Sequence, residues 1–156
     1  MHADNFANPK YEGLSASKFA YEDCLCESDL LTGSIVKALY DARVLESTFM
    51  FVTCEKGPQL DTWPDAGYTP FRGAKGTTYE GGIRVPGIAY RKGMISPGRV
   101  SDDVLDLMDL FNTAIRLADS ASRLFQTPKS TGSTVPFFAA RRRKVESPVC
   151  VLLVEE

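Results

Sequence analysis

The sequence has a single histidine, a single tryptophan and no apolar run long enough to cross a membrane. A membrane-spanning helix needs about 20 consecutive apolar residues, so we expect no membrane partner. The first five residues, Met1 to Asn5, are polar and lack the charged and apolar regions of a signal peptide. The chain as written is therefore expected to be soluble and not exported.

Neither sign of charge predominates. The chain has 18 Lys and Arg against 20 Asp and Glu, a net charge of -2, which gives no general reason to expect nucleic acid as a partner. The one basic run, Arg141 to Lys144, is typical of a solvated surface. A chain of 156 residues, 44% of them hydrophobic, can form one domain with its own core. Nothing therefore requires disulfides or a structural metal.

Cysteine is sparse and poorly spaced for a metal site. Cys24 and Cys26 are separated by one residue rather than the two of a zinc hook, and the only histidine is His2. Cys54 and Cys150 stand alone in the sequence. The pattern favours buried thiols over metal ligands.

Hydrophobic periodicity in the first third predicts an α/β protein. After a polar lead-in over residues 2–19, a helical period begins near Tyr21. The run from Thr48 to Thr53 is β-branched and aromatic, which is typical of a buried strand. A helix followed by a buried strand favours a layered fold with a central sheet. The apolar stripe of the helix consists of Leu31, Ile35, Leu39 and Ala42.

The middle of the chain combines a long loop with further regular elements. Residues 57–82 are rich in Gly and Pro, and loops of this length are usually functional or disordered. Ile83 to Tyr90 is predicted to be a strand, with Pro86 indicating an edge or a bulge. Ser101 to Ala118 is predicted to be a helix, begun by Ser101 and the two aspartates after it.

The loop carries a long and specific motif. It resembles the arylsulfatase signature Gly-Lys-Gly-Thr-x-x-Glu-Gly-Gly-x-Arg-x-Pro through Lys75-Gly76-Thr77, Glu80-Gly81-Gly82, Arg84 and Pro86. Its neighbours agree in order and spacing. Asp29 to Tyr40 resembles the family's preceding helix, Phe51 to Pro58 its strand ending in Ser-Asp-Asn-Gly-Pro, and Ser101 to Thr113 its following helix.

The resemblance implies the C-terminal part of a formylglycine-dependent sulfatase catalytic domain, over residues 1–118. It implies an alkaline-phosphatase-like α/β fold and hydrolysis of a sulfate ester, either a small molecule or a sulfated glycan. The family uses bound calcium and a formylglycine made from the cysteine of Cys-x-Pro-Ser-Arg. Its members are commonly periplasmic, lysosomal or secreted, whereas this chain shows no signal peptide, so its compartment stays open.

Two residues match the family's catalytic positions. Lys75 matches the lysine that binds sulfate, and an ammonium on a Gly-flanked loop can approach an anion closely. His2 lies where the family has the histidine that assists the leaving group. The competing interpretations are a solvated surface lysine and a terminal histidine present by chance.

Other positions depart from the family. Glu55-Lys56 replaces the metal-binding Asp-Asn pair. Glu55 keeps a carboxylate on a longer side chain, whereas Lys56 has no acceptor and adds a positive charge, so we expect weak or absent calcium binding. None of the four cysteines stands in Cys-x-Pro-Ser-Arg, so formylglycine is not available in this chain, which we expect to be inactive alone.

Three functional hypotheses follow from these departures. The first is an inactive sulfatase fragment that retains Lys75. The second is a non-catalytic module that binds sulfated or other anionic ligands through the Lys75 loop, and the third is a subunit completed by a separate N-terminal chain. Exposed sheet edges in a partial fold also predict self-association.

The last part of the chain differs in character. Residues 119–156 are expected to form an irregular tail, and alternative reading frames of this stretch resemble sulfatase segments, so we interpret it as translated out of frame. The run Val149 to Val154 has the composition of a strand but no sequence context that requires one.

Overall fold

The computed structural model describes residues 5–119 and 150–155. The described residues group into two compact units, one formed by residues 5–48 and 57–82 and the other by residues 49–56, 83–119 and 150–155. His2 and most of the predicted tail, including the basic run, lie outside the described residues. No helix of the described part is long and apolar enough to span a membrane.

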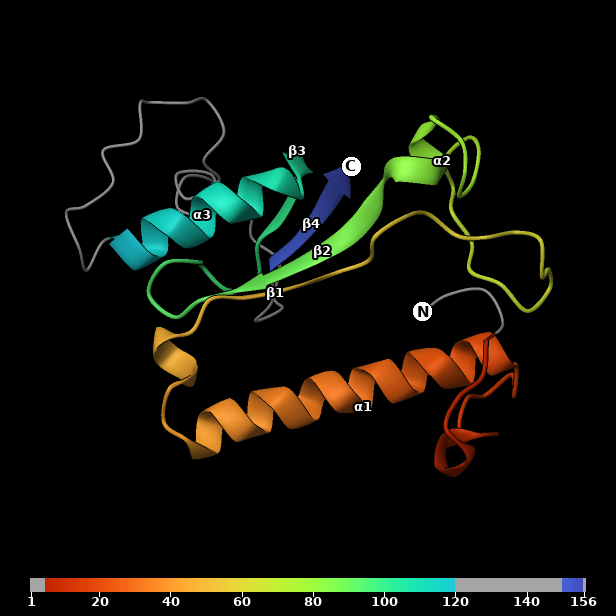
Figure 1. Ribbon diagram of the computed structural model, residues 1–156, viewed down its shortest axis with the longest axis horizontal. Coiled ribbons are helices and arrows are strands. Elements are labelled where there is room, and N and C mark those ends of the chain that lie inside the picture. The colour runs from red at the N-terminus through yellow and green to blue at the C-terminus, as the bar shows by residue number, and fades with distance from the viewer. Residues whose placement is uncertain (1–4, 120–149, 156) are drawn as a thin grey trace. The chain divides into compact units, whose positions relative to one another are not determined.

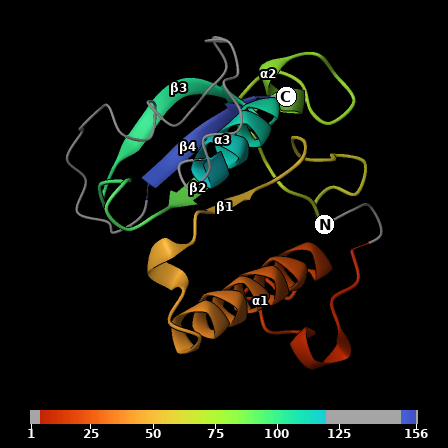
Figure 2. The ribbon, with the colours of Figure 1, turned by 60° about the vertical axis from the view of Figure 1, so that its left-hand side comes forward.

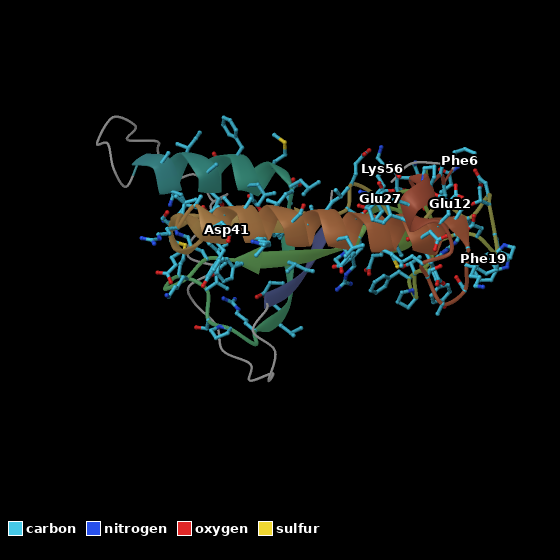
Figure 3. All side chains as sticks on the ribbon, turned by 90° about the horizontal axis from the view of Figure 1, so that it is seen from below. Phe6, Glu12, Phe19, Glu27, Asp41 and Lys56 are labelled. Carbon is cyan, nitrogen blue, oxygen red and sulfur yellow. The ribbon has the colours of Figure 1, made fainter. Side chains whose placement is uncertain are left out.

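The first unit is organised around one long helix, α1, from Ala20 to Asp41 (Figure 1). It begins within one residue of the predicted start, which confirms the helix. A short 3-10 helix, η1 (Pro9–Tyr11), precedes α1, and a second, η2 (Leu45–Ser47), follows it. The lead-in is tied to α1 because Glu27, labelled in Figure 3, accepts the N–H of Asn8 at 2.9 Å.

A buried carboxylate fixes the same lead-in at a second place. Asp23 Oδ1 accepts the N–H of Ser15 at 2.8 Å, and Asp23 Oδ2 accepts that of Gly13 at 2.7 Å. These hydrogen bonds hold the pKa of Asp23 below its ordinary value, and the one from Ser15 has the largest effect. The charged carboxylate is therefore part of what holds the lead-in against α1.

The apolar stripe of α1 is partly uncovered. Leu31 and Ile35 have exposed fractions of 50% and 58%. The helix therefore owes its stability to more than burial of this stripe. One local contribution is the Lys37–Asp41 ion pair at 2.5 Å, in which the partners are four residues apart.

The second unit contains a four-stranded sheet in the order β1-β2-β4-β3 (Figure 2). β1 (Met50–Thr53) pairs antiparallel with β2 (Val85–Tyr90). On its other side, β2 pairs antiparallel with β4 (Cys150–Glu155). The last strand in the order, β3 (Val100–Asp106), is parallel to β4. The core consists of Val85, Ala89, Ile95 and Leu105, with Phe49 and Phe51 packed against it.

The two predicted strands exist, but their places in the sheet differ from expectation. β1 was expected to be buried, yet Val52 is 37% exposed because, among the described strands, only β2 pairs with it. Pro86 indicated an edge or a bulge in β2, yet β2 lies between β1 and β4 and pairs with both in unbroken register. The pairing with β1 starts at Gly87, so Pro86 lies outside that ladder, where its missing N–H is tolerated.

The helix predicted from Ser101 is wrong in its first part. Residues 100–106 form β3, and the helix α3 spans Met108–Asp119. β3 gains its hydrogen bonds from β4, more than forty residues later in the chain, a pairing that local periodicity cannot reveal. The acidic helix start is present further along, where Asp106 Oδ1 accepts the N–H of Met108 at 2.7 Å.

The final apolar run is a strand in the structure. Cys150 to Glu155 form β4, which fills the position between β2 and β3. Its composition indicated this conformation, but its partners could not be inferred from the neighbouring sequence. The interpretation of the tail as out-of-frame translation stays a prediction.

Candidate functional site

The long loop of the first unit is held by hydrogen bonds between its own backbone groups. The N–H of Gly57 donates to the carbonyl of Gly82 at 2.9 Å, which closes the loop at its base. The N–H of Gly81 donates to Arg72 O at 2.8 Å, and a short helix, α2 (Glu80–Ile83), ends the segment. A loop of this length with internal hydrogen bonds has a defined shape, as expected of a functional loop.

Close backbone contact explains the glycine at the base of the loop. An ideal Cβ built on Gly57 would overlap the carbonyl oxygen of Gly81. Any larger residue would therefore push the two ends of the loop apart. Two glycines of the motif are crowded in the same way, because a Cβ on Gly81 would overlap Gly73 O and one on Gly82 would overlap Thr77 O.

Lys75 lies in a tight turn within this loop. The N–H of Thr77 donates to Ala74 O at 3.0 Å, and the Thr77 hydroxyl donates to the same oxygen at 2.8 Å. Gly76, next to Lys75, has φ of +89°, a left-handed conformation that glycine adopts without strain. The turn leaves the Lys75 side chain half-buried, and its Nζ donates to Gln59 Oε1 at 3.2 Å.

Two contacts within the loop, one of Gln59 and one of Arg72, were not predicted from the sequence. Gln59 precedes Lys75 by sixteen residues, and no motif connected them. Arg72 stacks its guanidinium over the ring of Tyr79, 4.0 Å from the centroid, a favourable cation–π contact. The sequence signal of that second contact was a basic residue before the motif and an aromatic residue at one of its variable positions.

Glu55, predicted to be a degenerate calcium position, follows β1 in the second unit. Lys56 Nζ lies 3.2 Å from Glu55 Oε1, so the two charges form an ion pair with each other. The position of Lys56 can be followed in Figure 3, where it is labelled. Among the described residues, no group of three or more His, Cys, Asp or Glu side chains could hold a metal ion.

The cysteines differ in their surroundings. Cys24 is buried, and burial raises the pKa of its thiol. Cys54 is exposed, which contradicts the prediction of buried thiols at that position, because it follows the end of an edge strand. The side chain of Cys150 lies outside the described residues.

Comparison with known proteins identifies the family. The family model described as Sulfatase matches residues 2–120. N-acetylgalactosamine-6-sulfatase of Canis lupus familiaris is 40% identical over 122 residues, which is 77% of this chain and 23% of that protein. Arylsulfatase A of Bos taurus is 31% identical over 152 residues, or 89% of this chain and 30% of that protein.

A solved structure supports the same conclusion. The PsFucS1 sulfatase from Pseudoalteromonas sp. is 41% identical and superposes with a TM-score of 0.79, covering 93% of this chain and 29% of that chain. The chain thus spans less than a third of the length of each of these relatives, and its α/β architecture is part of the sulfatase fold. On this evidence the chain belongs to the sulfatase family.

Proposed function

We propose that this chain carries the sulfate-binding lysine of a sulfuric ester hydrolase and that it does not turn over substrate alone. Lys75 would bind the sulfate group, and His2 would assist the departing alcohol. The observation that supports this proposal is the position of Lys75 on a rigid, Gly-flanked turn within the sulfatase motif. Relatives are named for sulfates of N-acetylgalactosamine and of steryl compounds, which favours a sulfated glycan or a small sulfate ester.

The chemistry of sulfate explains why this turn suits the role. A sulfate ester is an anion, and its leaving oxygen gains negative charge as the ester bond breaks. An ammonium fixed on a turn attracts this charge without being reorganised during the reaction. Because Lys75 is half-buried, water screens the attraction less than it would at a fully exposed site.

The proposed lack of turnover rests on the nucleophile and the metal position. No cysteine of this chain lies in Cys-x-Pro-Ser-Arg, the source of the family's formylglycine. Glu55 is paired with Lys56, so its carboxylate is already partly neutralised. These residues do not fit calcium, which prefers several oxygen ligands and no nearby cation.

The proposal is tested by titrating the 156-residue chain with inorganic sulfate and with an aryl sulfate. We expect saturable binding that Lys75→Met weakens by about tenfold or more, since a hydrogen bond to a charged group is lost. Lys18→Met is the matched control, because Lys18 is exposed in the same unit. Absence of binding by the unaltered chain would show that the Lys75 loop is not a sulfate site.

The same samples test the expected lack of catalysis. We expect no release of alcohol from the aryl sulfate by the chain alone. Release that depends on Lys75 would contradict the proposal. Release only after addition of an N-terminal sulfatase segment containing Cys-x-Pro-Ser-Arg would identify this chain as a subunit that needs a separate partner.

A further inference from the structure

The segment that follows Gly57 contacts Lys75 twice. The backbone N–H of Lys75 donates to Pro58 O at 3.0 Å, and its Nζ donates to Gln59 Oε1 at 3.2 Å. Two neighbouring residues therefore hold the backbone and the side-chain ammonium of Lys75. A lysine side chain has several rotatable bonds, and fixing both its backbone and its ammonium restricts where its charge can lie.

Asp61 continues this contact beyond Gln59. Gln59 Nε2 donates to Asp61 Oδ2 at 3.2 Å. An ammonium can only donate hydrogen bonds and an ionised carboxylate can only accept them. The amide of Gln59 can therefore join the two in one orientation alone, with its oxygen toward Lys75 and its nitrogen toward Asp61.

We propose that Gln59 is the positioning residue of Lys75 and that Asp61 sets the orientation of the Gln59 amide. This inference rests on the proposed sulfate-binding role of Lys75 and adds the residues that aim its charge. A neutral amide oxygen suits this task because it holds the ammonium without neutralising it. A carboxylate at the same position would form an ion pair and compete with sulfate for the lysine.

Two substitutions at position 59 separate the ability of the amide to accept a hydrogen bond from its lack of charge. Gln59→Met keeps a similar length but removes the acceptor, whereas Gln59→Glu keeps an acceptor and adds a negative charge. The readouts are the acylation rate of Lys75 measured by mass spectrometry, with Lys18 as internal reference, and the affinity of the whole chain for inorganic sulfate. Thr78→Met, at an exposed position of the same loop, is the matched control.

The variants are expected to change the two readouts in different combinations. Gln59→Met should raise the Lys75 acylation rate and weaken sulfate binding, each by about fivefold, the effect of one hydrogen bond. Gln59→Glu should slow acylation yet weaken sulfate binding further. Asp61→Leu should shift both readouts in the same direction as Gln59→Met. A general loosening of the loop would not slow acylation in one variant and accelerate it in another.

Other outcomes overturn one proposal or the other. If Gln59→Met leaves the acylation rate of Lys75 unchanged, Gln59 does not position the lysine. If acylation responds as expected but the unaltered chain does not bind sulfate, the sulfate-binding role fails and the assignment of Gln59 stands. A change in either readout in Thr78→Met would show that the loop responds to any substitution, which would remove the support for Gln59.

Discussion

Gly57 is the position at which one added methyl group should damage the loop most. It is buried, its N–H donates to Gly82 O at 2.9 Å, and a Cβ there would overlap Gly81 O. The atoms that such a Cβ would meet belong to the carbonyl groups of Gly81 and Gly82. These groups are part of the backbone, so they cannot rotate away. Overpacking costs about 1–3 kcal/mol and a weakened hydrogen bond adds about 0.5–1.5 kcal/mol. We therefore expect Gly57→Ala to lower the free energy of unfolding by about 1.5–4.5 kcal/mol.

The same substitution in α1 provides a control of opposite sign. A Cβ on Gly33 would have nothing within 4 Å, and Gly33 is exposed in the middle of the helix. Gly33→Ala should raise the free energy of unfolding by about 0.8–1 kcal/mol, the difference in helix propensity. Urea unfolding followed by far-ultraviolet circular dichroism measures both. A Gly57→Ala variant as stable as the unaltered chain would refute the close approach of Gly57 and Gly81.

Two further predictions concern a carboxylate and the core. The hydrogen bonds from Ser15 and Gly13 lower the pKa of Asp23, so its stabilising effect is present above its ordinary pKa of 3.8 and is lost as pH falls through the lower folded-state pKa. Asp23→Asn should therefore flatten the decline of the thermal midpoint in acid, whereas Asp29→Asn, on the exposed part of α1, should leave the decline intact. Leu105 is fully buried, so Leu105→Ala should cost about 2–5 kcal/mol in urea unfolding. A smaller loss than in the exposed control Met108→Ala would contradict the assigned core.

The sequence alone identified the elements that depend on local pattern. The helix from Ala20 has a repeating apolar stripe, and helical hydrogen bonds connect residues only four apart, so its existence follows from nearby residues. The sulfatase motif is written in glycines that the local backbone requires, since Gly76 has a positive φ and a Cβ on Gly81 would overlap Gly73 O. Lys75 was singled out by its place in that motif.

Tertiary structure decided the features that depend on distant residues. Residues 101–106 were predicted to begin a helix, but pairing with β4 makes them part of a strand, and that partner lies more than forty residues away. β2 became an inner strand for the same reason, despite Pro86. Gln59 gained its relation to Lys75 only when the loop closed at Gly57 and brought Pro58 and Gln59 beside the turn. Contacts between segments far apart in sequence leave no periodic trace in either segment, so the sequence could single out Lys75 but not its contact with Gln59.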